Sequence, residues 1–193
     1  MTRDDPTMKS KNCLKLTRFF CHPSFCRLFL AALLLAPLTL FAQASIKLAT
    51  FRCDMTPPVG APLCGGCVKP VASVREPLLA LGGVILGADK AIVRCAVDWC
   101  ELRGADHVCW CEQLARAAGT TADHVALQSL HQHTAPIADS VAHKILAGTT
   151  APLEVIDVAW AERALAGVAV IVEASLKKIS PVTHIVHGEA KVD

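Results

Sequence analysis

Residues 125–136 have the sequence Val-Ala-Leu-Gln-Ser-Leu-His-Gln-His-Thr-Ala-Pro, a short apolar run that ends in His131 and His133. The run predicts a strand, and successive side chains of a strand point to opposite faces. The two imidazoles would therefore project from one face at the carboxyl end of the strand, where open α/β sheets bind ligands. Imidazole is a common zinc ligand, so the pattern indicates part of a metal site. The alternative is a surface turn with two polar residues before Pro136.

The segments upstream of this strand predict three further strands and one irregular loop. Residues 47–54 alternate apolar and polar side chains, as a half-buried strand does. Residues 56–70 contain two adjacent prolines, which predict an irregular loop. Residues 78–86, with a break at Gly82-Gly83, and residues 91–98 are separated by a short turn and predict a hairpin. The second strand of the hairpin is almost continuously apolar, which predicts a central strand covered on both faces.

A helix connects this hairpin to the strand that carries the histidines. Asp106 can cap it, and Gly119 ends it after Ala118. Short strand–helix–strand connections are right-handed and make the two strands parallel, so Asp98 and His131 should lie at one edge of the sheet. A carboxylate there could orient a ligating imidazole by accepting a hydrogen bond from its other ring nitrogen, or it could hold a substrate group. The alternative is a loop aspartate that accepts hydrogen bonds from nearby backbone N–H groups.

The segments downstream predict two helices and a last strand. Residues 138–147 form a short helix, and residues 157–179 form a longer one with an apolar stripe along one side. Residues 182–188 have strand composition, with His184 and His187 out of phase, so these two histidines are interpreted as structural or exposed. The predicted fold class is α/β, with a mixed sheet flanked by helices.

Residues 1–44 predict an export signal. They hold six Lys and Arg against two Asp, and the apolar run 28–42 leads into Ala42-Gln43-Ala44. The run is shorter than the roughly 20 residues of a membrane span, so cleavage after Ala44 is the preferred interpretation. It places a single domain, residues 45–193, in the secreted or periplasmic space. The alternative is an uncleaved signal anchor that keeps the protein in contact with the membrane.

The charge pattern argues against nucleic acid as a partner. The whole chain has a formal net charge of +2, but residues 45–193 hold thirteen Lys and Arg against fifteen Asp and Glu. A weakly acidic body without a basic stripe offers no electrostatic attraction for a phosphate backbone.

Seven of the ten cysteines lie in the body of the chain. Cys64 and Cys67 form one close pair in a Gly- and Pro-rich loop, and they are the candidates for a disulfide or for reactive thiols. A second C-x-x-C motif is absent from the sequence, which argues against a four-cysteine zinc site. Three others are interpreted as small buried side chains: Cys95, Cys100 and Cys109.

Three segments within residues 47–193 resemble the amino-terminal part of the neutral, non-lysosomal ceramidase family. Asp54-Met-Thr-Pro-Pro-Val-Gly60 is similar to the family's opening Asp-Ile-Thr-Pro-Pro-Val-Gly. Arg75-Glu-Pro-Leu-Leu-Ala-Leu81 lies where the family has an Asp-Pro-Leu-x-Ala strand. Leu130-His-Gln-His-Thr-Ala-Pro136 is similar to the family's Thr-His-Thr-His-Ser-Gly-Pro. Three positions of the last motif depart from that pattern: Gln132, Thr134 and Ala135.

In that family the first histidine ligates zinc and the second lies in the active site beside the substrate. The resemblance therefore implies His131 as a metal ligand and His133 as a catalytic residue. It implies a hydrolase of lipid or small-molecule amides, in which zinc polarises the carbonyl and activates water or a hydroxyl. The family's other ligands, a histidine, a glutamate and a tyrosine, come far downstream, as does its nucleophile. This chain contains no tyrosine.

We therefore expect the front fragment of an exported zinc-dependent, ceramidase-like amide hydrolase. The domain would be incomplete, would hold zinc only in a complete form and would be inactive on its own, because a catalytic zinc needs about three protein ligands. The alternative is a non-catalytic α/β module that is exported or anchored to the membrane.

Overall fold

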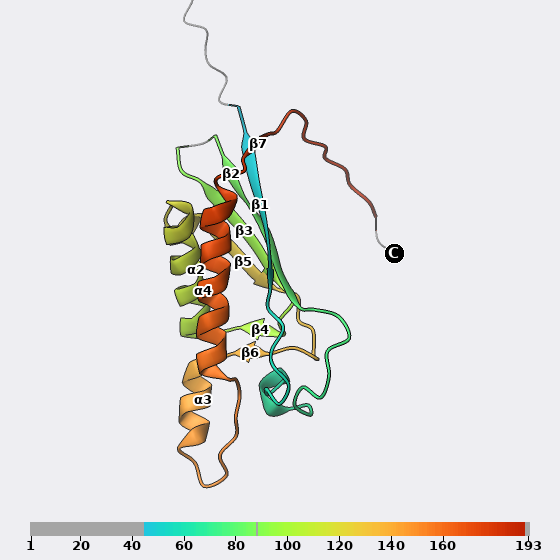
Figure 1. The fold of residues 1–193 in the computed structure, drawn as a ribbon, viewed down its shortest axis with the longest axis vertical. Helices are drawn as coiled ribbons and strands as arrows, with labels where there is room; N and C mark the ends of the chain where they lie inside the picture. The colour runs from blue at the N-terminus through green and yellow to red at the C-terminus, as the bar shows by residue number, and fades with distance from the viewer. Residues whose placement is uncertain (1–44, 88, 192–193) are drawn as a thin grey trace, which may run out of the picture. The chain divides into compact units, whose positions relative to one another are not determined.

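A five-stranded mixed sheet forms the centre of the protein in the computed structural model, which describes residues 45–87 and 89–191 (Figure 1). Its strand order is β5–β3–β2–β1–β7. The strands are β1 (Lys47–Asp54), β2 (Leu79–Leu86), β3 (Ile92–Val97), β5 (Val125–Ser129) and β7 (Ser180–Pro181). Strands β3 and β5 are parallel, whereas the other neighbouring pairs are antiparallel.

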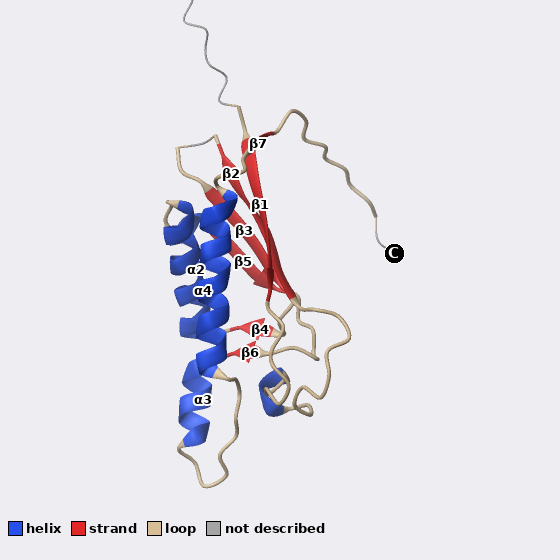
Figure 2. Cartoon of the chain, in the orientation of Figure 1, coloured by secondary structure: helices blue, strands red, loops and turns tan. Residues whose placement is uncertain are grey.

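Helices flank this sheet, and a second, two-stranded sheet lies beyond the ends of its strands (Figure 2). The helices are α2 (Gly104–Ala118), α3 (Ser140–Ala147) and α4 (Val158–Ser175), and the short 3₁₀ turns are η1 (Cys64–Gly66) and η2 (Ala122–His124). The small sheet pairs β4 (Glu101–Leu102) with β6 (Ile137–Ala138) in parallel. The predicted fold class, α/β with a mixed sheet flanked by helices, is confirmed.

Helices α2 and α4 lie side by side on one face of the five-stranded sheet (Figure 1). Strand β1 buries every second side chain from Ala49 to Cys53, which confirms the alternation predicted for it. The side chains of this core include Ala49, Phe51, Val84, Val93, Cys95, Leu114, Val168 and Val172. The expectation that β3 is covered on both faces is wrong, because Arg94 is exposed between the buried Val93 and Cys95.

Strand β2 runs through Gly82-Gly83 without the predicted break. Gly82 lies opposite Phe51 in the β1–β2 ladder, and a Cβ atom at position 82 would collide with the Phe51 ring and with the carbonyl oxygen of Arg94. The glycine therefore makes room for an aromatic ring that packs across the strand.

All three helices start at residues other than the predicted ones, and an aspartate side chain lies at each start. Helix α2 begins at Gly104, so Asp106 lies in its first turn instead of at its N-cap. The carboxylate of Asp106 accepts a hydrogen bond from the backbone N–H of Ser140 at 2.6 Å. Asp139 and Asp157 cap α3 and α4 by accepting hydrogen bonds from backbone N–H groups three residues on. Helix α3 therefore starts at Ser140, two residues later than predicted, and α4 starts at Val158, one residue later.

The predicted strand over residues 182–188 is wrong. Strand β7 ends at Pro181, before this segment, and beyond it the N–H of Val182 donates one hydrogen bond to the Ile46 carbonyl at 2.8 Å. Strand β1 begins at Lys47, so the described chain offers the following residues no strand to pair with. The long helix also ends at Ser175 rather than Ile179. His184 and His187 are exposed, as one of the two interpretations expected.

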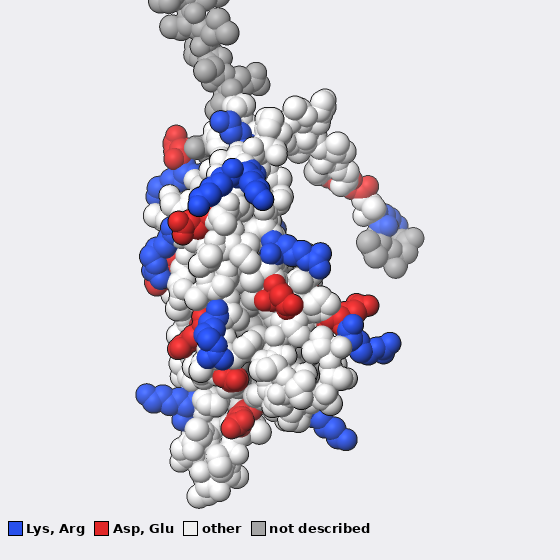
Figure 3. Space-filling view, viewed as in Figure 1, with Lys and Arg blue, Asp and Glu red and all other residues white. Residues whose placement is uncertain are grey.

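The predicted leader, residues 1–44, lies outside the described residues, so its cleavage and the proposed location of the protein stay predictions. Among the residues that are described, none of the helices is both long and apolar enough to cross a membrane. Positive and negative side chains are interspersed on the face shown in Figure 3. The exclusion of nucleic acid as a partner stays a prediction.

Candidate active site

The carboxyl ends of β3 and β5 lie next to each other, as the parallel crossover predicts. Val97 and Ser129 are paired in register, and beyond them the backbone N–H of Leu130 donates to the Val97 carbonyl at 3.1 Å. The two segments pair again as β4 and β6. Residues 130–136 between these points form a loop, which we call the histidine loop.

His131 and His133 lie in this loop and not on the strand, because β5 ends at Ser129. His131 adopts a left-handed backbone conformation with φ 61°, and its N–H donates to the Trp99 carbonyl at 3.1 Å. Non-glycine residues pay about 1 kcal/mol or more for this conformation, and such strain clusters at functional sites. The prediction of one shared strand face is therefore corrected, although the two imidazoles do lie together, edge to face, with ring centroids 5.0 Å apart.

The histidine loop separates two cavities. His131 and His133 line one of about 390 Å³, which we call the histidine pocket, together with Cys64, Cys67, Cys100, Glu101, Arg103 and Asp139. Gln132 and Thr134 line the other, of about 780 Å³, which we call the larger pocket. Side chains of the loop thus alternate between the two cavities even though the loop is not a strand.

Glu101 is the carboxylate beside His131. Its Oε1 atom is 3.4 Å from His131 Nδ1, and its Oε2 atom accepts a hydrogen bond from Arg103 Nε. The hydrogen bond from Arg103 lowers the pKa of Glu101, and the positive charge of Arg103 lowers it further, so the group is anionic at neutral pH. An anion at Nδ1 favours the tautomer with the proton on that nitrogen, which leaves the lone pair of Nε2 available to a ligand.

Asp98 contacts a different part of the protein. Its Oδ2 atom accepts a hydrogen bond from the Leu79 N–H at 2.9 Å, and its own N–H donates to the Leu79 carbonyl at 2.8 Å. This is the arrangement that the alternative interpretation of Asp98 expected. The carboxylate next to His131 is thus Glu101, and a role for Asp98 in holding a substrate group stays a prediction.

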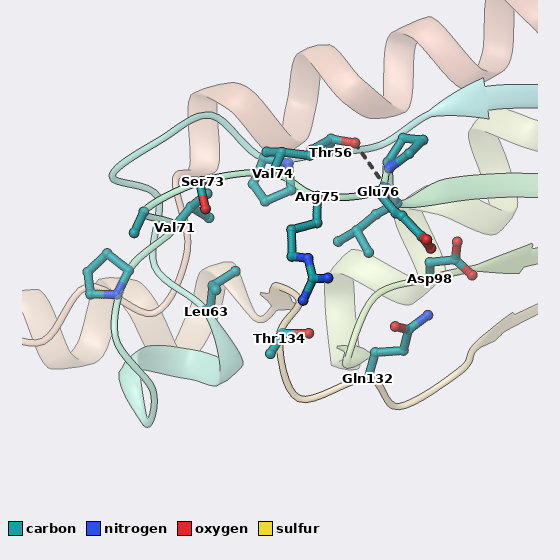
Figure 4. Close-up of a pocket in the computed structure, with 15 residues that line it drawn as sticks. Thr56, Leu63, Val71, Ser73, Val74, Arg75, Glu76, Asp98, Gln132 and Thr134 are labelled. Carbon is teal, nitrogen blue, oxygen red and sulfur yellow. Dashed lines mark hydrogen bonds between the residues drawn. The ribbon is translucent and has the colours of Figure 1, made fainter.

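Asp98 lines the larger pocket, which has a polar wall (Figure 4). Figure 4 shows the guanidinium of Arg75 directed into the cavity towards Thr134, with Glu76 and Asp98 on the neighbouring wall. A cation and two carboxylates that line one cavity can bind a polar group that carries both donors and acceptors.

The described residues do not complete a metal site. Among residues 45–87 and 89–191, no group of three His, Cys, Asp or Glu side chains is arranged to hold a metal ion. His131 and His133 are suitable donors by chemistry, but a catalytic zinc needs about three protein ligands. This part of the chain therefore does not fit a zinc ion by itself.

Glu101 and Arg103 were not identified from the sequence. The crossover rule could have identified them as candidates, because the parallel crossover that places Asp98 at the edge of the sheet also places the residues after Asp98 there. Which of two carboxylates three residues apart would face the imidazole depends on the small sheet of β4 and β6, whose two-residue strands are too short to be recognised from sequence.

We expect Arg103→Gln to raise the pKa of Glu101 towards its ordinary value, because the charged hydrogen bond that stabilises the carboxylate is lost. Carboxyl carbon NMR over a pH titration measures the shift. Arg116→Gln is the matched control, since Arg116 pairs with Glu112 at 4.0 Å on the exposed side of α2. An unchanged pKa of Glu101 in Arg103→Gln would mean that the pair does not exist in solution.

Comparison with known proteins identifies a related fold. No family model and no curated protein matches the chain. Its structure is similar to a neutral ceramidase from Pseudomonas aeruginosa, with a TM-score of 0.51 and 14% sequence identity over 72% of this chain. A second structure, described as a ceramidase complexed with C2, gives a TM-score of 0.47 and 15% identity over the same share. The chain spans 22% of the length of each of these two proteins. At such low identity the first likeness shows the fold alone, and that fold is ceramidase-like.

Proposed function

We propose that residues 45–193 are the segment of a zinc-dependent, ceramidase-like amide hydrolase that carries the histidine loop. His131 contributes one zinc ligand and His133 acts on the substrate. One observation carries the proposal: two imidazoles lie 5.0 Å apart beside an anionic carboxylate, at the carboxyl edge of a sheet with a ceramidase-like fold. Ligand sites of α/β sheets concentrate at this edge.

The residues of the segment have separate tasks in this proposal. Glu101, held by Arg103, orients the His131 ring so that Nε2 is directed at a ligand. His133, on the wall of the histidine pocket, can take a proton from an attacking group or return one to the leaving amine. Bound zinc would supply polarisation of the amide carbonyl. The larger pocket, with Arg75 and Asp98, holds polar groups of a lipid or small-molecule amide.

The segment is inactive by itself in this proposal. The residues that the structure describes offer no group of three ligands, so the remaining ones come from elsewhere in a complete protein. The proposal includes export through the leader, residues 1–44, with membrane contact where the leader is retained.

Zinc content tests the role of His131. The complete form should contain about one zinc ion per chain, and His131→Ala should lose most of it because an incomplete set of ligands forfeits the energy of closing the site. His124→Ala is the matched control, since His124 lies at the opposite end of β5 beside Asp123. Elemental analysis of the purified proteins measures the difference. Equal zinc in wild type and His131→Ala would exclude His131 as a ligand.

Hydrolysis of an N-acyl substrate tests the role of His133. His133→Ala should keep its zinc and lose activity about 100-fold or more, the usual contribution of a general acid or base. Residues 45–193 alone should release no product above the buffer rate, and cleavage by them would contradict the proposed inactivity of the segment.

A non-catalytic module is the second candidate function. The absence of a three-ligand group among the described residues favours it. A complete form that contains no zinc above the level of His131→Ala, and cleaves no N-acyl substrate, would establish this alternative.

A further inference from the structure

Three cysteines gather at the histidine pocket, and two of them are in contact. Cys64, Cys67 and Cys100 all line the cavity, and the Sγ atoms of Cys64 and Cys100 are 3.9 Å apart although the residues are separated by 36 positions. Cys100 is 1% exposed, whereas Cys64 is half-buried and Cys67 is exposed. The sequence had indicated the close pair Cys64 and Cys67 for a disulfide, but the folded chain brings Cys64 to Cys100.

The other cysteines of the body are placed differently. Cys53, Cys95 and Cys111 are buried in the core between the sheet and the helices, and burial raises the pKa of each thiol. Burial of Cys95 was expected and is confirmed, whereas Cys109, expected to be buried, is exposed on α2. A thiol that stays protonated in a closed core is unreactive, so among these cysteines of the body the accessible thiols are Cys109 on α2 and those at the histidine pocket.

The backbones of Cys64 and Cys100 hold the end of the histidine loop. The N–H of Cys64 donates to the carbonyl of Ala135 at 2.8 Å, and the N–H of Cys100 donates to the carbonyl of Pro136 at 2.9 Å. Cys64 also has a left-handed backbone with φ 47°, which is uncommon for a residue other than glycine. A strained residue persists only where the surrounding structure holds it in place, so the position of Cys64 is set by these tertiary contacts.

We propose that Cys64 and Cys100 form a reversible disulfide that joins η1 to the β3–β4 connection and fixes the carboxyl end of the histidine loop. A disulfide requires sulfur atoms about 2 Å apart, so the two Sγ atoms must approach by roughly 2 Å. Rotation about the Cα–Cβ bonds moves sulfur atoms over such distances, and the pocket beside them leaves room for it.

A small disulfide such as oxidised glutathione is the oxidant. The Cys64 thiolate, on the more accessible residue, attacks one sulfur of oxidised glutathione, forms a mixed disulfide and releases one glutathione thiolate. Cys100 then loses its proton and attacks the Cys64 sulfur, which releases the second glutathione thiolate. Two thiols are oxidised and one disulfide is reduced. Burial raises the pKa of Cys100 to about 11, which makes Cys64 the first nucleophile.

Peptide mapping of the full chain tests the pairing. The protein is equilibrated with oxidised and reduced glutathione, its remaining thiols are alkylated, and it is cleaved on the amino side of aspartate. Peptide 98–105 then contains Cys100 as its single cysteine, and peptide 54–88 contains Cys64 and Cys67. Mass spectrometry should find these two peptides joined, with the loss of two hydrogen atoms.

Two variants separate the neighbouring thiols. The joined peptides should persist in Cys67→Ser and disappear in Cys64→Ser, while Cys109→Ser, on the exposed side of α2, serves as the matched control. In wild type, a bond within peptide 54–88 together with alkylated Cys100 would overturn the proposal. Alkylation of all three thiols under these conditions would also overturn it, and neither result depends on a variant folding.

Hydrogen exchange tests the effect on the histidine loop. Backbone amides of residues 130–137 should exchange about tenfold more slowly in the oxidised protein than in the reduced one, because the bond ties together the two residues that hold Ala135 and Pro136. Equal exchange rates with the disulfide present would mean that the bond does not fix the loop. Neither measurement depends on zinc or on hydrolysis, so the result is independent of the proposed function.

Discussion

Replacing Trp99 with alanine should lower the free energy of unfolding by about 4 kcal/mol, the usual cost of removing a large aromatic side chain from a core. Trp99 is fully buried two residues after the end of β3, with its ring centroid 5.3 Å from that of Trp110 and 5.2 Å from that of Trp160. Its indole N–H donates to the Met55 carbonyl at 3.0 Å. The substitution therefore removes contacts to two helices and to the end of β1 at once.

Urea denaturation followed by circular dichroism measures this loss. Val170→Ala is a suitable control, because Val170 is 65% exposed on α4 and its truncation should change stability by less than about 0.5 kcal/mol. Trp99→Phe should give an intermediate loss, since it keeps an apolar ring and removes the hydrogen bond. A loss below about 1 kcal/mol in Trp99→Ala would contradict the packing described for this residue.

The same residue supports the candidate site. The Trp99 carbonyl accepts the backbone hydrogen bond of His131, and Trp99 precedes Cys100 and Glu101. A cavity at position 99 should therefore also loosen the histidine loop. We therefore expect core packing and the placement of the two imidazoles to be energetically coupled, as contacting groups generally are.

Replacing Gly82 with alanine should destabilise the protein by about 3 kcal/mol, the upper range for forcing extra atoms into a packed core. The added methyl group would collide with the ring of Phe51 and with the carbonyl oxygen of Arg94, and the latter is backbone of the neighbouring strand. A backbone atom in a paired strand cannot rotate away. Either the β2–β3 ladder or the Phe51 ring must move.

Gly167→Ala is the matched control, because its expected change in stability has the opposite sign to that of Gly82→Ala. Gly167 lies within α4, a Cβ atom there meets no other atom within 4 Å, and alanine should stabilise the helix by up to about 1 kcal/mol. Thermal denaturation of both variants measures the contrast. A Gly82→Ala protein as stable as wild type would show that Phe51 does not cover position 82.

Local patterns in the sequence were sufficient for the main elements of the fold. The alternation in β1, the hairpin of β2 and β3 and the helix that ends at Gly119 all follow from periodicity and from residues with special backbone preferences. The parallel pairing of β3 and β5 follows from the handedness of a short crossover. That rule alone was enough to assign His131 to the correct edge of the sheet, because the edge depends only on the direction of the strand that precedes it.

The details of the candidate site depended on tertiary contacts that no local pattern contains. Glu101 faces His131, and Cys64 reaches Cys100, because β4 and β6 pair beyond the main sheet and because η1 packs against Ala135. These contacts join residues that are far apart in the chain, so their geometry is decided only when the whole core packs. The sequence by itself determined the long strands and helices and the edge of the sheet that carries the histidines. The tertiary structure decided the short strands β4, β6 and β7 and which side chains meet at that edge.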